Sequence, residues 1–283
     1  MAGLRTLLIL GRTSNLPTVW SNCLAGFLLG HGGGWGRLTL LCFGATLVYL
    51  GGMFLNDAVD VDFDRQHRIE RPIPSGKISV REVWSWSFGL LLAGVICLSA
   101  IGPTTAVLTI FLASSVLLYD LVHKMVAFAP VLMAACRFFL YLVAASSGYR
   151  GVTGLAVWSA LALGCYIVGL SYLARRESMH GPLRFWPCYF LAVPILLAWL
   201  ENGDPGDRQV WVIAFAFAAW VLFCLRHILA RPPGNISYTV SGLLAGIVLV
   251  DLLAVAPATT LLSGIFAALF LTAHIFQRYI PAT

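Results

Sequence analysis

Long apolar stretches alternate with short polar loops along the whole chain. About twenty consecutive apolar residues are enough to cross a bilayer as an α-helix. The segments of this kind lie at residues 14–30, 38–55, 84–101, 103–122, 126–147, 152–171, 185–200, 209–228, 238–256 and 258–277. Several of them are short or closely spaced, so the pattern is compatible with nine membrane spans as well as ten. It predicts an all-α, polytopic membrane helix bundle that forms a single transmembrane domain over residues 1–283.

Composition supports a membrane protein. Hydrophobic residues make up 59% of the chain and charged residues only 11%, which excludes a soluble globule with an ordinary charged surface. The seven cysteines are scattered singly through apolar stretches without metal-ligand or redox spacing. We therefore expect them to be small buried residues.

The net charge of +6 indicates membrane orientation rather than binding to nucleic acid, because the basic residues lie in short loops between apolar spans. If the N-terminus is inside, the inside loops and the two termini hold fourteen Lys and Arg residues, against three in the outside loops. An excess of this kind is typical of cytoplasmic loops. The inside loops are those at 56–83, 123–125, 172–184 and 226–236.

Residues 51–79 form the only densely charged segment of the chain, and five of the twelve acidic residues fall within fourteen consecutive positions there. On a helix, the four-residue spacing of Asn56, Asp60 and Asp64 places them on one face. Asp57 lies about a quarter turn away. Like charges at this spacing repel each other, which favours a cation between them. Mg²⁺ commonly binds one or two carboxylates together with substrate phosphates.

Two arginines follow this acidic face. Arg68 lies one helical turn beyond Asp64, and Arg71 directly precedes Pro72, which together with Pro74 is expected to end the helix. Guanidinium groups can bind phosphate oxygens through two parallel hydrogen bonds. Carboxylates, a divalent metal and arginines together suit a pyrophosphate. The alternative is a solvated loop whose charges only balance, and the regular spacing disfavours it.

The run N-D-x-x-D-x-x-x-D followed by R-x-x-R-P, at Asn56–Pro72, resembles the first aspartate-rich motif of the UbiA superfamily of intramembrane prenyltransferases. The segment R-T-S-N-L-P-T that begins at Arg12 is similar to the superfamily's shorter amino-terminal signature, and we expect its Asn15 to face the substrate. The resemblance to the superfamily covers nearly the whole chain. It implies a UbiA-like bundle with Mg²⁺ as cofactor. The expected metal ligands are Asn56, Asp57, Asp60, Asp64 and Glu177.

The resemblance also implies an enzyme that moves a prenyl group from a prenyl pyrophosphate to an aromatic or lipid acceptor. Asp60, Asp64 and Lys124 are the expected catalytic residues. Lys124 ends a Tyr119-Asp120-x-x-x-Lys124 segment, at a place where the superfamily often has a tyrosine followed by a basic residue. Alternatively, Lys124 is an interface lysine whose charged end extends to water. Asp120 either joins the acidic cluster or pairs with Lys124.

A charge inside an apolar span is costly and usually faces a bundle interior or a polar cavity. Arg137 lies in such a span, and we expect it to line the substrate pocket, with a structural ion pair as the alternative. Asp251 also lies in an apolar span. It either faces the pocket or a structural partner, as Arg137 does, or lies near the outer interface. The expected substrate-binding residues are Asn15, Arg68, Arg71, Tyr119, Arg137, Arg175 and Arg176.

The chain departs from the superfamily after the sixth apolar segment, where a second motif of the form D-x-x-x-D is expected. The sequence there reads S-Y-L-A-R-R-E-S, with Glu177 as the only acidic residue and with Arg175 and Arg176 where carboxylates are expected. The arginines could replace a metal ion in binding pyrophosphate oxygens. They could also be membrane anchors in a non-catalytic protein that binds or transports a prenyl lipid or pigment precursor. We favour the enzyme, because a lipid binder has no need for stacked carboxylates.

The same S-Y-L-A-R-R-E-S segment and the M-A-A-C-R segment that ends at Arg137 together resemble a divergent UbiA-like branch associated with bacterial Ebo gene clusters. This implies a protein of the bacterial inner (plasma) membrane. The excess of Lys and Arg in the inside loops predicts that its aspartate-rich loop lies on the cytoplasmic side. The sequence does not indicate the acceptor, the prenyl chain length or the oligomeric state.

Overall fold

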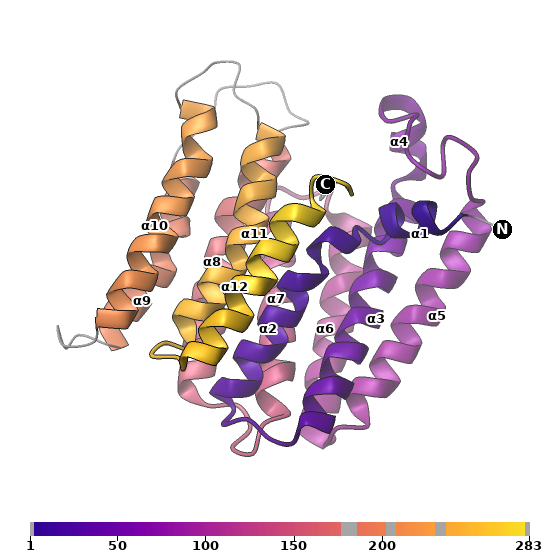
Figure 1. Ribbon diagram of the computed structural model, residues 1–283. Coiled ribbons are helices and arrows are strands. Elements are labelled where there is room, and N and C mark those ends of the chain that lie inside the picture. Colours follow the sequence, from indigo (N-terminus) through magenta and orange to yellow (C-terminus); the bar gives the residue numbers. More distant parts are fainter. Residues whose placement is uncertain (1–2, 177–185, 202–207, 230–235, 281–283) are drawn as a thin grey trace.

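The computed structural model describes residues 3–176, 186–201, 208–229 and 236–280, and every regular element within these ranges is helical (Figure 1). Each expected span coincides with a helical element. In chain order these are α2 (Leu16–Leu29), α3 (Trp35–Val59), α5 (Val80–Ser99), α6 (Pro103–Val122), α7 (Ala129–Ser146), α8 (Gly154–Arg176), a 3₁₀ turn (Trp186–Ala192) with α9 (Val193–Glu201), α10 (Arg208–Leu229), α11 (Ile236–Ala254) and α12 (Thr260–Phe276). Three short elements complete the description: α1 (Leu4–Leu10), a 3₁₀ turn (Thr13–Asn15) and α4 (Val61–His67). The prediction of an all-α membrane bundle is confirmed.

Among the described residues, seven helices are long and apolar enough to cross a membrane: α3, α5, α6, α7, α8, α10 and α11. The segment expected at 185–200 differs in form, because it begins as a 3₁₀ turn and continues as the short helix α9. Pro187 and Pro194 lie within this segment. A proline has no backbone N–H to donate and restricts its neighbours, so a single regular helix cannot run through both positions without a break.

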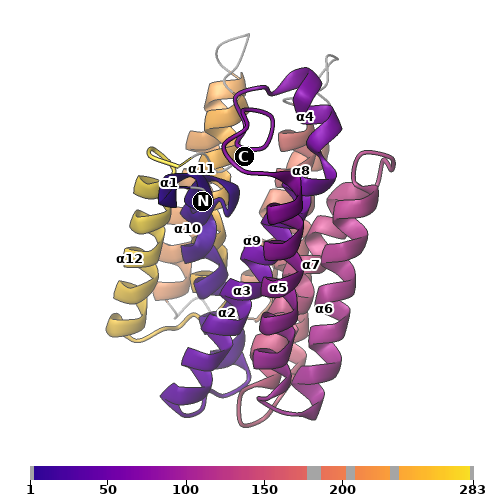
Figure 2. The same ribbon diagram turned by 90° about the vertical axis from the view of Figure 1, so that its right-hand side faces the viewer.

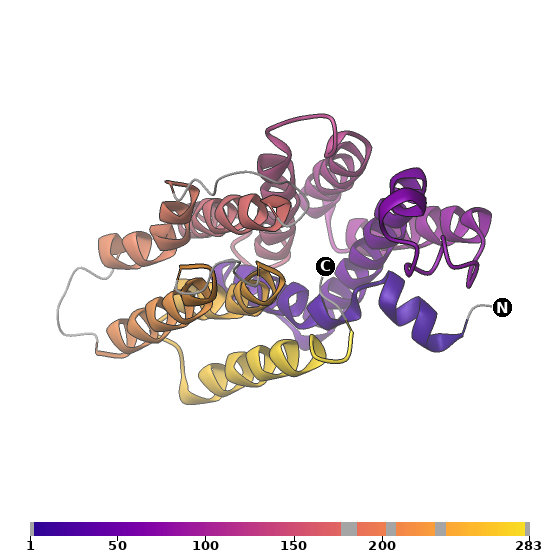
Figure 3. The same cartoon turned by 90° about the horizontal axis from the view of Figure 1, so that it is seen from above.

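Helices α2 and α11 form the centre of the bundle. Most residues of both helices are buried, and α2 packs against α3, α7, α11 and α12. Seen along the bundle, α12 lies on one side and α8 on the other, with α2 and α11 between them (Figure 3). The outer helices instead carry exposed large apolar residues, such as Ile110 on α6 and Phe215 on α10, as expected for surfaces that contact lipid.

Helices α3 and α5 approach each other closely at glycine residues. A Cβ atom added to Gly94 would lie 2.8 Å from the backbone nitrogen of Val48 and 3.0 Å from the carbonyl oxygen of Gly44. Small residues at helix contacts let backbones approach within a membrane. This contact therefore fixes α5 against the helix that leads into the acidic segment.

Replacing Gly94 by Leu should lower the free energy of unfolding by about 1–3 kcal/mol, because the added side chain overpacks a closed contact. Thermal unfolding of the detergent-solubilised protein measures this change. Gly89 lies on the same helix, and a Cβ there meets nothing within 4 Å, so Gly89→Leu is the matched control and should leave stability nearly unchanged. Equal stability of the two variants would contradict the close packing of α3 and α5.

Candidate active site

The acidic face is built where α3 passes into α4. The backbone N–H of Asp60 donates to the carbonyl oxygen of Asn56 at 3.0 Å, and that of Asp64 donates to the carbonyl oxygen of Asp60 at 2.9 Å. The four-residue hydrogen-bond spacing therefore continues through the junction, which keeps the three side chains on one side. The helix ends at His67, five positions before Pro72, so the expectation that the prolines end it was wrong. The prolines instead shape the loop that follows.

A cavity of about 670 Å³ opens beside this face, between the Thr13–Asn15 turn and helices α3, α4, α6, α7, α8 and α11. Figure 2 shows α4 at the same end of the bundle as the loop that joins α6 to α7; we call this the α4 end. Ten of the expected site residues line the cavity: Asn15, Asn56, Asp60, Asp64, Arg68, Arg71, Tyr119, Lys124, Arg137 and Arg175.

Three expected site residues are placed differently. Asp57 is buried and does not lie on the cavity wall. Arg176 is the last residue of α8, and its side chain lies outside the described part of the structure. Glu177 also lies outside the described residues.

Lys124 and His123 converge on Asp60. The Nζ atom of Lys124 lies 2.7 Å from Asp60 Oδ1, and His123 Nε2 lies 3.5 Å from Asp60 Oδ2. Lys124 also stacks over the ring of Phe63 at 4.0 Å, so in this structure it is part of the cavity wall rather than an isolated interface lysine. Burial opposes ionisation of Asp60, but the hydrogen bonds and charges of His123 and Lys124 outweigh it and lower the pKa of this carboxyl group. Burial likewise opposes the charged form of His123, yet its pairing with Asp60 raises the pKa of the imidazole.

Arg71 binds the other two carboxylates. Its Nη1 atom lies 2.8 Å from Asp64 Oδ2 and 3.2 Å from Asp57 Oδ1. Asp57 Oδ1 also accepts a hydrogen bond from Nη2 of Arg12 at 3.3 Å. Asp57 therefore holds two guanidinium groups at the edge of the cavity, and its role as a metal ligand stays a prediction.

Asn56 connects the acidic face to α6 and to the turn that follows α1. Its Nδ2 donates to Asp120 Oδ1 on α6 at 3.0 Å, and its Oδ1 accepts from Arg12 Nη2 at 3.3 Å. Asp120 thus joins the acidic cluster through Asn56, whereas Lys124 pairs with Asp60. Arg12 was quoted in the amino-terminal motif, but the sequence reasoning gave it no role. The available signal was an arginine placed directly before the first span, three residues from Asn15.

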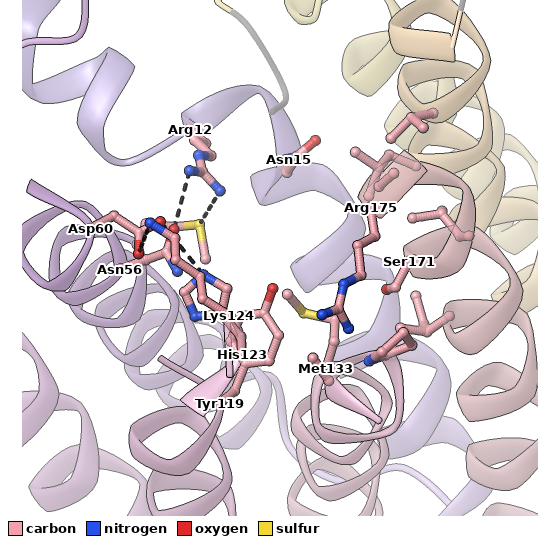
Figure 4. A pocket seen from close by; sticks show the side chains of 18 of the residues that line it. Arg12, Asn15, Asn56, Asp60, Tyr119, His123, Lys124, Met133, Ser171 and Arg175 are labelled. Carbon is pink, nitrogen blue, oxygen red and sulfur yellow. Dashed lines mark hydrogen bonds and ion pairs between the residues drawn. The ribbon is translucent and has the colours of Figure 1, made fainter. Parts of the chain in front are cut away.

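Arg175 faces this cluster across the cavity. Figure 4 shows Asn56, Asp60, His123 and Lys124 on one wall, with Arg175 and Ser171 from α8 on the other. Nη1 of Arg175 donates to the carbonyl oxygens of Val126 and Ala127 at 2.8 and 3.1 Å. These two contacts link α8 to the same short loop that carries Lys124.

Apolar side chains line the cavity between α7, α8 and α11. They come from Met133, Ile167, Leu170, Val240, Leu244 and Ile247. The cavity therefore has a charged wall near the α4 end and an apolar wall that reaches into the bundle. This division suits a ligand with a highly charged head and a hydrocarbon chain.

Within the described part of the chain, no three His, Cys, Asp or Glu side chains converge closely enough to hold a metal ion by themselves. Asp60 and Asp64 do line the cavity, and each is paired with a cationic side chain of the protein. This arrangement does not fit a closed protein cage for a metal. It fits Mg²⁺, which commonly uses one or two carboxylates and completes its coordination with waters and substrate phosphates.

Comparison with known proteins gives a family match. Residues 17–181 match the UbiA prenyltransferase family. Digeranylgeranylglyceryl phosphate synthase of Sulfolobus acidocaldarius is 32% identical over 185 residues, which cover 63% of this chain and 61% of that protein. The 4-hydroxybenzoate octaprenyltransferase of a Polaromonas species is 37% identical over 90 residues, which cover 31% of this chain and 29% of that protein. The matched regions thus span less than two thirds of these relatives.

Solved structures share the fold over nearly the whole chain. A digeranylgeranylglyceryl phosphate synthase superimposes with a TM-score of 0.62 at 18% identity, covering 96% of this chain and 99% of the other. A UbiA homologue from Archaeoglobus fulgidus, solved with GPP and Mg²⁺ bound, gives a TM-score of 0.57 at 17% identity and covers 96% of this chain and 98% of its own. At these identities the likeness establishes the fold.

Proposed function

Because this chain belongs to the UbiA prenyltransferase family, we propose that it transfers a prenyl group from a prenyl pyrophosphate to an aromatic or lipid acceptor with the help of Mg²⁺. One observation carries the proposal. Two carboxylates and several cationic side chains line one end of a cavity whose inner wall is apolar. The A. fulgidus homologue, which was solved with GPP and Mg²⁺, supports the same substrate class.

The pyrophosphate would bind at the charged wall. Mg²⁺ held by Asp60 and Asp64 would neutralise the negative charge that develops on the leaving pyrophosphate. Lys124, Arg68 and Arg71 line the same wall and can donate to its oxygens. Cationic groups aimed at developing charge are commonly the largest catalytic contribution for such an ionisation.

Cleavage of the allylic C–O bond leaves the electron pair on the pyrophosphate and gives an allylic cation. Met133, Leu170 and Leu244 belong to the apolar wall and would keep water from this cation. The acceptor attacks the cation with a pair of π or oxygen lone-pair electrons and then loses a proton. The protein therefore contributes charge neutralisation, orientation and the exclusion of water.

The chain is an integral membrane protein, as its apolar helices and its family indicate. We further infer that residues 1–283 form one domain in a bacterial inner membrane. The high density of Lys and Arg in the loops of the α4 end supports a cytoplasmic position for the acidic segment.

The carboxylates of the site are already paired with protein cations, and this affects metal binding. A metal ion at Asp60 and Asp64 must compete with Lys124 and Arg71, which lie at 2.7 and 2.8 Å from the two carboxylates. A bound pyrophosphate gives these two cations new anionic partners. Mg²⁺ and the prenyl pyrophosphate should therefore bind cooperatively.

Removing Mg²⁺ with EDTA should weaken binding of an unreactive prenyl thiopyrophosphate about tenfold or more, a coupling of the usual size for linked sites. Equilibrium binding to the purified protein at fixed ionic strength measures the effect. Ca²⁺ is the control, because it carries the same charge as Mg²⁺ but does not require octahedral coordination. The same dissociation constant with and without Mg²⁺ would contradict the metal assignment.

The direct test of the function is pyrophosphate release from a panel of prenyl pyrophosphates, with and without Mg²⁺, with a bacterial lipid extract as the source of acceptors. Metal-dependent release identifies a transferase. Binding without release for every chain length and extract would favour the second candidate, a protein that binds or transports a prenyl lipid or pigment precursor. The observation that favours this candidate is Arg175, which lies in the region where the resemblance to the superfamily leads us to expect a second acidic motif.

A further inference from the structure

A second polar cluster lies between α2, α7 and α11. Asp251 on α11 is fully buried inside the bundle. Its Oδ2 accepts hydrogen bonds from Ser21 Oγ at 2.5 Å and from Asn22 Nδ2 at 2.7 Å, both on α2. Asn22 Oδ1 in turn accepts from Arg137 Nη1 at 2.6 Å. The amide of Asn22 thus connects a buried carboxylate to a guanidinium group that lines the cavity.

Two N–H groups of Arg137, which lines the cavity, have no hydrogen-bond partner among the described residues. Its Nη1 also donates to the carbonyl oxygen of Thr18 at 3.2 Å, and its Nη2 donates to Thr18 Oγ1 at 3.0 Å. These contacts use three of the five N–H groups of an arginine. Within the described residues, the Nε–H and one N–H of Nη2 have no hydrogen-bond partner.

Arg137 is well separated along α7 from the charged wall. It lies eight residues after Ala129, where α7 begins at the α4 end. At 1.5 Å per residue this is a depth of about 12 Å. The loop with Lys124, which contacts Asp60, lies before the start of α7. The cavity therefore has a second polar position deeper in the bundle, beside the apolar wall.

The deep guanidinium needs a partner. Unsatisfied donors and charges within a membrane are costly, and the carboxylate of Asp251 reaches Arg137 only through Asn22. A fixed cation near the path of an allylic cation would also repel it. An anion bound at Arg137 removes both problems. Donors on two neighbouring nitrogens match the two oxygens of a carboxylate or phosphate group.

We propose that Arg137 binds the acidic group of the prenyl acceptor, a carboxylate or a phosphate, and that Asn22 and Asp251 hold its guanidinium in position. The inference rests on the proposed function, because it assigns the acceptor end of the same cavity. Arg137 is then a specificity-determining residue. Asn22 and Asp251 are positioning residues, since they act through Arg137 and lie behind it.

The test compares acceptors that differ only in the acidic group. One pair is 4-hydroxybenzoate and its methyl ester, and the other is a prenylglyceryl phosphate and the prenylglycerol without phosphate. The wild-type protein should prefer the acid over its neutral counterpart by about tenfold or more in KM in one of the pairs, as expected for a hydrogen-bonded charged group. A preference within the first pair identifies a carboxylate acceptor, and a preference within the second pair identifies a lipid phosphate. No preference in either pair, measured as turnover or as direct binding, would overturn the proposal.

Variants at the site give a second, independent readout. Arg137→Gln should raise the KM for the acid acceptor about tenfold or more and leave the KM for the prenyl pyrophosphate unchanged. Arg137→Lys should restore part of the affinity. Asp251→Asn should shift the same KM in the same direction by a smaller factor. Arg150→Gln, at an exposed arginine outside the cavity, is the control and should change neither constant.

The failure of this inference can be told from the failure of the proposed function. Mg²⁺-dependent binding of a prenyl thiopyrophosphate to the wild-type protein tests the function without involving Arg137. If that binding is present and Arg137→Gln raises both KM values or neither, only the assignment of Arg137 is wrong. If that binding is absent, the proposed function is itself wrong.

Discussion

Replacing Asp60 by Asn should lower Mg²⁺-dependent pyrophosphate release about a hundredfold or more while the bundle stays folded. Asp60 lines the cavity and is the carboxylate on which Lys124 and His123 converge. Asparagine keeps the shape and removes the charge, so it weakens metal binding and leaves Lys124 without its ionic partner. A metal ion contributes several kcal/mol to the neutralisation of a leaving group, and each 1.4 kcal/mol corresponds to about a factor of ten in rate. A phosphate-release assay and thermal unfolding measure the two effects.

The matched control lies on α4, two residues after Asp60. The side chain of Asp62 is 86% exposed, and its one ion pair within the described part of the chain is with Arg65, at 3.2 Å. An exposed ion pair of this kind contributes little to stability, and Asp62 does not line the cavity. Asp62→Asn should therefore release pyrophosphate at the wild-type rate. Asp64→Asn should resemble Asp60→Asn, because Asp64 also lines the cavity. Wild-type release, or wild-type affinity for Mg²⁺ and pyrophosphate, in both cavity variants would exclude these carboxylates as the metal site.

The sequence predicts what depends on local spacing. The apolar spans could be placed because their length is set by the bilayer, and the acidic face could be placed because residues four apart share a helix face. Both predictions needed only neighbouring residues. The end of α4 was misplaced because the prolines were taken as the stop signal, although the helix ends at His67.

The partners of the site residues could not be predicted in the same way. The contact of Arg12 with Asp57 joins residues 45 positions apart, and that of Asn22 with Asp251 joins residues 229 positions apart. Such pairs depend on how α2, α3 and α11 pack, and no periodicity in the sequence encodes this. For Arg137 the sequence left a choice between a pocket residue and a structural pair. The structure combines the two, because the guanidinium lines the cavity while Asn22 connects it to Asp251.

Replacing Arg175 by Gln should lower pyrophosphate release about tenfold to a hundredfold, the usual effect of losing a charge-assisted hydrogen bond. Within the described residues, α8 contributes no carboxylate to the cavity, and Arg175 is its one charged residue there. It faces Asp60 and Lys124 across the cavity (Figure 4). A planar guanidinium can hold two pyrophosphate oxygens and so supply charge in the region where the resemblance to the superfamily leads us to expect a second acidic motif.

Three further measurements show what Arg175 does. Arg175→Lys keeps the charge but loses the planar fork, so it should recover only part of the rate. Arg226→Gln is the control, because Arg226 is exposed, stacks over Phe223 at 4.0 Å and lies outside the cavity. Arg175 also donates a hydrogen bond to the loop that carries Lys124, so the affinity for a prenyl thiopyrophosphate must be measured beside the rate. If Arg175 contacts the pyrophosphate directly, Arg175→Gln should lower both the affinity and the rate. If Arg175→Gln binds and releases pyrophosphate as the wild type does, the arginine is a membrane anchor and one metal site suffices without it.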